Sequence, residues 1–227
     1  MRIGLFGGSF DPVHNGHVGL VQRFLAEKVV DRVVVLPAAV SPFKTDARPS
    51  EDYDRLLLVR AAFMGMANVT VDPRELKRGG VSYAIDTVKE FKAEFPDDEL
   101  IFMVGDDTAA ELERWKDWET LRTLCRFESY PRTPEASHDI RRMLAEGESI
   151  HGLVPEAVEL FLKHHVTYQP DEKIVNAVLN GLARKEGYCP CRLPKLPEFV
   201  CPCQEFRGQL ADASYHGLCH CRLYLKP

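Results

Sequence analysis

Two groups of residues in this 227-residue chain have the types and spacing that chemistry requires. The first is the pair Gly7-Gly8, followed by His14 and His17 three residues apart. Glycines let a backbone approach a ligand closely, and a helix that follows them presents unpaired N–H groups and partial positive charge, which suit a phosphate. Both imidazoles could point to the same anion. This stretch therefore predicts a phosphate-binding loop rather than a glycine turn with two surface histidines.

The second group is a set of cysteines in three Cys-x-Cys pairs within the last 39 residues. The pairs are Cys189-Pro190-Cys191, Cys201-Pro202-Cys203 and Cys219-His220-Cys221. In a reducing cytosol, clustered cysteines indicate metal binding or redox chemistry rather than structural disulfides. Their spacing leaves both an iron–sulfur cluster and zinc open, although zinc usually takes pairs with two to four intervening residues.

The charge pattern changes near residues 168–171. Residues 1–170 carry 21 basic and 28 acidic side chains, whereas residues 171–227 carry 8 and 6. The net charge of −5 disfavours sequence-independent binding to DNA, because no excess of cations can displace phosphate counterions. The longest apolar run, 29–40, is interrupted by charges, and the N-terminus lacks a signal-peptide pattern. We therefore expect a cytoplasmic protein without nucleic-acid or membrane partners.

Short apolar runs alternate with amphipathic stretches through the first 165 residues, which is typical of a parallel sheet with helical connections. The expected strands are 2–6, 32–36, 68–71, 100–104 and 124–128, the last with Cys125 as a buried small hydrophobe. The expected helices include 15–27, 50–66, 84–95 and 171–186. We predict an α/β, Rossmann-like domain with helices on both faces, and a small, mainly helical C-terminal domain. Ligands of such sheets bind beyond the carboxyl ends of the strands.

The N-terminal motifs resemble the nucleotidyltransferase superfamily, and specifically bacterial nicotinate-nucleotide adenylyltransferases, over residues 1–167. After the phosphate loop, the similar stretches are 41–44, 82–87, 105–107 with Trp115 and Trp118, and 140–158. The chain departs from the family pattern at a few positions. Ala136 and His138 stand where the family has hydroxyl residues before Ile-Arg, and Ala84 replaces a threonine.

This resemblance implies transfer of AMP from ATP to nicotinate mononucleotide, giving deamido-NAD and pyrophosphate with Mg²⁺. Such a reaction needs alignment and charge stabilisation rather than a covalent nucleophile. The implied catalytic residues are His14, His17, Lys44 and Arg141. The implied nucleotide-binding residues are Gly7, Gly8, Ser9, Phe10, Thr87, Asp107 and Trp115. Asp107 would contact the adenosine ribose, and Trp115 would present an aromatic face to the pyridine ring.

The cysteine pairs and their neighbours resemble the catalytic chain of ferredoxin:thioredoxin reductase over residues 171–227. That resemblance implies a 4Fe-4S cluster whose ligands are Cys189, Cys201, Cys203 and Cys219. It also implies a redox-active disulfide between Cys191 and Cys221, with His220 as proton donor. Ferredoxin and a thioredoxin-like or other disulfide protein would be the partners.

We expect an adenylyltransferase domain, 1–167, fused to an iron–sulfur disulfide reductase domain, 171–227. Two alternatives remain open from the sequence. In the first, the N-terminal domain only binds nucleotide, and the chain is a ferredoxin-dependent disulfide reductase. In the second, the C-terminal domain is a structural zinc module that mediates association. The choice between nicotinate and nicotinamide mononucleotide also remains open.

Overall fold

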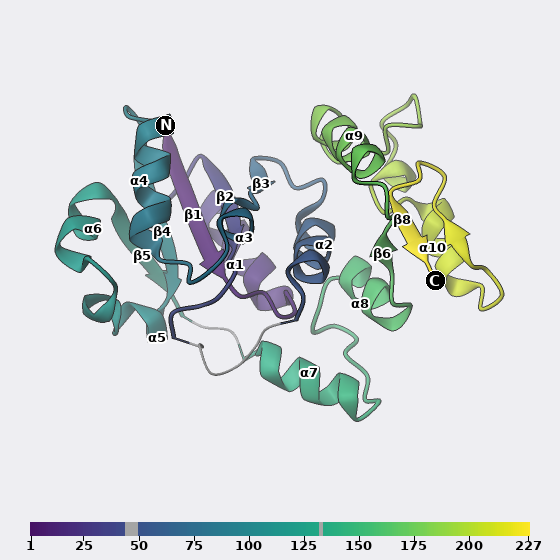
Figure 1. The fold of residues 1–227 in the computed structure, drawn as a ribbon, viewed down its shortest axis with the longest axis horizontal. Coiled ribbons are helices and arrows are strands. Elements are labelled where there is room, and N and C mark those ends of the chain that lie inside the picture. The colour runs from purple at the N-terminus through teal and green to yellow at the C-terminus, as the bar shows by residue number, and fades with distance from the viewer. Residues whose placement is uncertain (44–49, 132–133) are drawn as a thin grey trace.

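The structure is a computed structural model, and it describes residues 1–43, 50–131 and 134–227. Its main layer is a five-stranded parallel sheet in the order β3-β2-β1-β4-β5 (Figure 1). The strands are β1 (Arg2–Gly8), β2 (Arg32–Pro37), β3 (Val69–Val71), β4 (Glu99–Gly105) and β5 (Arg126–Tyr130). All five were expected from the sequence, and their parallel pairing confirms the Rossmann-like α/β fold.

Helices cover both faces of the sheet, as predicted. Successive strand residues point to opposite faces. In β2, Val33 and Val35 pack on one face, while Val34 and Leu36 pack on the other. The helices on the first face are α1 (Asn15–Ala26) and α2 (Asp52–Phe63), and those on the second are α4 (Ala84–Glu94) and α6 (Trp118–Leu124). Since both faces of the central strands are buried, β1, β2 and β4 each contain an uninterrupted run of buried residues.

Shorter helices fill the connections between these layers. They are α3 (Arg74–Arg78), α5 (Asp106–Ala109), the 3-10 helix η1 (Leu112–Arg114), α7 (Ser137–Ala145) and α8 (Glu156–Lys163). In the described ranges, no helix combines the length and the apolar character that crossing a bilayer requires.

The rest of the chain forms a second lobe, on the right in Figure 1. Its helices are α9 (Glu172–Arg184), the 3-10 helix η2 (Pro197–Phe199) and α10 (Gln204–Ala211). The Asp171 carboxylate accepts the backbone N–H of Lys173 at 2.9 Å and so caps α9 where the sequence predicts its start. A three-stranded antiparallel sheet, which the expected mainly helical domain did not include, joins β6 (Thr167–Tyr168), β8 (Tyr224–Lys226) and β7 (Gly217–Leu218). Strands this short give no periodicity to detect.

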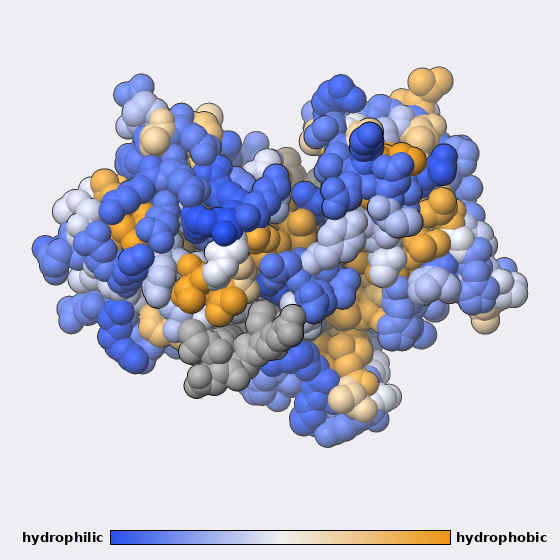
Figure 2. All heavy atoms as spheres, in the orientation of Figure 1, coloured by the Kyte–Doolittle hydropathy of each residue, from blue (hydrophilic) through white to orange (hydrophobic). Residues whose placement is uncertain are grey.

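One hydrophobic core continues from the first face of the sheet into the second lobe. Tyr168 stacks on Tyr224 with ring centroids 5.7 Å apart, and Phe161 meets Tyr224 edge-on at 4.8 Å. Above α2, the surface is hollowed between the lobes (Figure 2). The cleft is lined by residues of α2, α3 and α9, including Arg60 and Lys77. In the view of Figure 1, the lobes therefore meet at α2, and the cleft opens above this helix.

Candidate active site and cysteine cluster

The loop between β1 and α1, residues 9–14, orients the two histidines. The backbone N–H of His14 donates to Nδ1 of His17 at 3.2 Å, and the two ring centroids are 3.7 Å apart. Because Nδ1 of His17 accepts this bond, the neutral ring carries its proton on Nε2. The N–H of the His17 ring is therefore fixed at Nε2, at the start of α1 and beside the positive end of the helix dipole. A phosphate oxygen is the acceptor that this arrangement suits.

Phe10, a residue of the same loop, packs its buried side chain against His17. Its side chain is 1% exposed, and its ring meets that of His17 edge-on at 4.9 Å. A Cβ atom at Gly8 would lie 3.0 Å from the Phe10 ring, so a larger residue there would require the ring to shift by a few tenths of an ångström. The buried ring of Phe10 can shape this loop, and its predicted contact with nucleotide would have to come from the backbone.

Helix α7 brings Arg141 to this loop from a distant part of the sequence. The Arg141 guanidinium donates to the carbonyl oxygen of Asp11, and its Nη1 lies 3.8 Å from the Asp11 carboxylate. The hydroxyl of Ser137, at the start of α7, donates to the carbonyl of Pro12 at 2.9 Å. The structure thus brings Arg141 together with the histidine loop. Lys44, the other predicted cation, lies outside the described residues.

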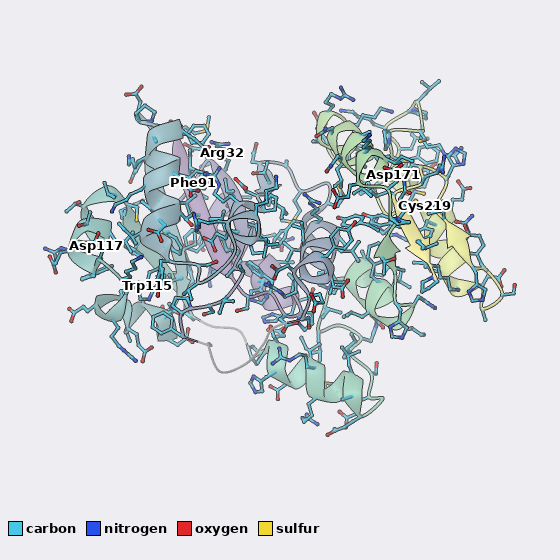
Figure 3. The ribbon with its side chains drawn as sticks, viewed as in Figure 1. Arg32, Phe91, Trp115, Asp117, Asp171 and Cys219 are labelled. Atoms are coloured by element: carbon cyan, nitrogen blue, oxygen red, sulfur yellow. The ribbon has the colours of Figure 1, made fainter. Side chains whose placement is uncertain are left out.

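Aromatic side chains gather near the end of β4. Trp115 packs edge-on against Phe102 and Phe127, with centroid distances of 5.4 and 5.8 Å, and Phe43 lies 6.4 Å from it. Among the described residues, no group accepts a hydrogen bond from the Trp115 indole N–H. Figure 3 shows Trp115 below α4, in the lobe that contains the five-stranded sheet. Asp107 is exposed on the short helix α5 of the same region.

Thr87 has a buried position that the sequence did not indicate. Its side chain is fully buried, and its hydroxyl donates to Glu75 at 2.6 Å and accepts from Arg78 at 2.9 Å. Burial raises the pKa of Glu75, while hydrogen bonds from Thr87 and Ser82 oppose that shift. The Ser82 hydroxyl in turn accepts the backbone N–H of Ala39 at 3.0 Å. The network therefore holds the turn before α4 against the loop after β2, and a direct contact of Thr87 with nucleotide stays a prediction.

The cysteine pairs meet in the second lobe, where Figure 3 labels Cys219. The Cys219 and Cys221 sulfurs lie 3.5 Å apart, and two backbone N–H groups donate to Cys219 Sγ at 3.3 Å. Hydrogen bonds from Cys203 and Cys221 lower the pKa of Cys189 far below the ordinary thiol value. The buried members of this thiol cluster are Cys189, Cys201, Cys203, Cys219 and Cys221.

The predicted redox pair is not formed in this structure. Cys191 is exposed and shares a hydrogen bond with Cys189, while Cys221 lies against Cys219, and all these cysteines are free thiols. His220 is exposed. Within the described ranges, no group of three or more His, Cys, Asp or Glu residues is arranged to hold a metal ion. The expected 4Fe-4S site is therefore not preformed, because the sulfurs pack directly against one another. Cys125, by contrast, is buried as expected, which raises its pKa to about 12.

Sequence reasoning did not single out Arg55, although it lies at the centre of the loops described above. It is followed by four aliphatic residues in α2, and its side chain is 1% exposed. An arginine at a position that helical periodicity assigns to the core is the signal that could have found it.

Comparisons with known proteins agree with this geometry. The model of the cytidylyltransferase-like family matches residues 5–175. A Gemmatimonas aurantiaca protein named probable nicotinate-nucleotide adenylyltransferase is 35% identical over 190 residues, covering 71% of this chain and 90% of the relative. One of the same name from Thermus thermophilus is 36% identical over 189 residues, covering 74% and 100%. Plasmodium falciparum nicotinic acid mononucleotide adenylyltransferase complexed with NaAD has a similar fold, with a TM-score of 0.56, 14% identity and coverage of 72% and 96%.

Proposed function

Because the chain belongs to the cytidylyltransferase-like family and, within it, to the nicotinate-nucleotide adenylyltransferases, we propose that it transfers AMP from ATP to nicotinate mononucleotide. The products would be deamido-NAD and pyrophosphate. The phosphate of the mononucleotide attacks the α-phosphorus of ATP, and the bond to the β-phosphate oxygen breaks. Atoms balance without a covalent intermediate, so the protein has to align the reactants and stabilise the leaving pyrophosphate.

The observation that carries the proposal is the fixed donor on His17. A helix start with a preorganised imidazole N–H is suited to a phosphate whose charge grows in the transition state. Arg141 lies against the same loop, where it can add cationic contacts to phosphate oxygens. Lys44 is proposed to contribute from the loop after β2. The roles proposed for Asp107 and Trp115 are the ribose and pyridine contacts.

Mg²⁺ would enter this site with ATP. In the described part of the chain, no cluster of carboxylates could hold the ion by itself. Magnesium commonly binds nucleotide phosphates with few protein ligands, so the residues present fit an ion that the triphosphate carries. It would neutralise negative charge on the phosphates. The protein residues would hold the reacting groups in line.

Pyrophosphate release from ATP tests this function directly. The purified full-length chain is expected to release pyrophosphate with ATP, Mg²⁺ and nicotinate mononucleotide, and to form deamido-NAD in equal amount. Parallel reactions with nicotinamide mononucleotide measure the preference for the acid or the amide. Binding of ATP without pyrophosphate release from either mononucleotide would contradict the proposal and favour the alternative of a nucleotide-binding domain on a reductase.

For the thiol cluster we propose an iron–sulfur disulfide reductase module, which would use ferredoxin as electron donor and a thioredoxin-like or other disulfide protein as target. Five buried thiols in one cluster supply the soft ligands that iron–sulfur clusters take, and N–H donors already point at Cys219 Sγ. The arrangement described above does not enclose such a group, because Cys219 and Cys221 are in direct contact. Their sulfurs would have to separate when a cluster binds.

Absorption and metal analysis of the protein test the module. Protein purified without oxygen is expected to absorb broadly near ~400 nm, since thiolate-to-iron charge transfer gives such a band. Iron and acid-labile sulfide should be present in equal amounts. Replacement of Cys219 by serine should remove the band, whereas replacement of Cys125, in the other lobe, should not. A colourless protein with one equivalent of zinc would contradict the iron–sulfur assignment and favour the structural zinc module.

A further inference from the structure

Arg55 is a buried arginine whose hydrogen bonds are all made inside the protein. A guanidinium has five N–H donors. In this structure each of the five has an acceptor. They are the carbonyls of Ser50 (3.0 Å, from Nε), Ser9 (2.8 Å, from Nη1), Ala38 (2.7 Å, from Nη1) and Ala39 (3.3 Å, from Nη2), and the Asp52 carboxylate (from Nη2). Arg55 therefore has no donor left for a substrate.

The carbonyls that Arg55 holds belong to two loops at the same edge of the sheet. Ser9 lies in the loop between β1 and α1. Ala38 and Ala39 begin the loop after β2, and Ser50 lies at the end of that loop. The backbone N–H of Ala38 also donates to the carbonyl of Gly8 at 2.9 Å, so the two loops touch where they leave the sheet. One side chain thus fixes both ends of the loop after β2 against the histidine loop.

Packing alone does not explain a cation at this position. Burial of a charge is unfavourable unless hydrogen bonds and an opposite charge compensate it. Asp52 supplies the opposite charge, but its side chain is 50% exposed, so much of the compensation comes from the backbone carbonyls. The next four residues of α2 are aliphatic, and a similar side chain at position 55 could fill space without tying the loops. The guanidinium is therefore needed for the geometry of the loops.

We propose that Arg55 is a positioning residue for the adenylyl transfer proposed above, on which this inference rests. It holds the histidine loop and the loop after β2 at the separation that in-line attack requires. A misplacement of about 1 Å can lower a rate by about 10²-fold. The substrate contacts proposed for His17 and Arg141 would remain when the hydrogen bonds of Arg55 are lost. Loss of Arg55 should therefore lower kcat much more than it raises KM.

The test is Arg55→Ala in the full-length enzyme, assayed by pyrophosphate release and normalised to the folded fraction from circular dichroism. We expect kcat to fall by about 10²-fold, with smaller changes in KM for both substrates. Guanidinium chloride at a low, non-denaturing concentration should restore part of the lost kcat by occupying the space of the missing side chain. A variant that was only destabilised would lose activity instead, because guanidinium favours unfolding.

Two further variants and a salt control complete the test. Arg60→Ala removes an arginine of the same helix that lines the cleft between the lobes, and it should keep wild-type kcat and show no rescue. Arg55→Lys keeps the charge with a different donor geometry and should have intermediate kcat; it replaces Arg55→Ala if that variant does not fold. Wild-type kcat in a folded Arg55 variant, or restoration by sodium chloride equal to that by guanidinium, would overturn the inference. An inactive wild-type enzyme would instead overturn the proposed function.

Discussion

Replacement of both His14 and His17 by alanine is expected to lower kcat for adenylyl transfer by at least about 10³-fold, because loss of one preorganised donor to a developing anion costs about 10²–10³-fold. The two ring centroids are 3.7 Å apart at the start of α1, so the rings should act as a unit. Their contributions should then be less than additive. Steady-state pyrophosphate release, with kcat and KM determined for each substrate, measures the effect.

The single variants should differ in a way that the geometry dictates. The donor to Nδ1 of His17 is the backbone N–H of His14, so His14→Ala removes a ring contact but keeps the hydrogen bond that orients His17. His17→Ala removes the oriented Nε2 donor itself and should be the more damaging. His17→Gln, whose amide nitrogen can stand near the position of Nε2, should retain more activity than His17→Ala.

His151 provides the matched control histidine. Its ring is exposed and lies 3.1 Å from the Glu159 carboxylate, outside the loop between β1 and α1. His151→Ala should therefore keep wild-type kcat and KM. A folded double variant of His14 and His17 with wild-type kcat would contradict the phosphate role of these residues and leave Arg141 and Lys44 as the candidates for that role.

The sequence predicts the elements of the first lobe well because their signals are local. In the expected strand 32–36, the four residues after Arg32 form a continuous apolar run, and each of Val33, Val34, Val35 and Leu36 is at most 3% exposed in the structure. The glycines that end β1 and the histidines that follow it lie within one short stretch, so their spacing alone places the histidines at a helix start. The position of Arg141 followed from the family resemblance, and the structure brings it to Asp11.

The remaining features depend on contacts between distant parts of the chain. Arg55 bonds to Ser9, which lies 46 residues away, and no periodicity predicts such a pair. The buried hydrogen bonds of Thr87 depend on Glu75 and Arg78 from another helix, whereas its motif alone suggested a nucleotide-binding residue. For the thiol cluster, the sequence contains a clear pattern, but the predicted site is not formed. The spacing of its cysteines suggested a metal, but it did not show that the sulfurs would pack as free thiols.

The second large effect is expected where the two lobes meet through two glycines. Gly187 has φ of +88°, and a Cβ atom there would lie 2.5 Å from the backbone nitrogen of Gly65 and 2.6 Å from its Cα. No side chain can move aside, because the contact is with backbone. Gly187→Ala should therefore destabilise the protein by about 2–5 kcal/mol, from conformational strain and overpacking together. For a chain of this size, that lowers Tm by about 5–15 °C.

Gly208→Ala is the matched control, because Gly208 lies in α10 with no atom near its added Cβ. It should leave Tm unchanged or raise it slightly, since alanine lowers the entropy of the unfolded chain. A Tm for Gly187→Ala at or above that of the wild type would mean that the lobes do not meet through this contact. Pyrophosphate release by the same variant adds a second result. Gly65 lies two residues after the end of α2, the helix that carries Arg55. A loss of kcat larger than the unfolded fraction explains would therefore show that docking of the second lobe supports the proposed nucleotide site.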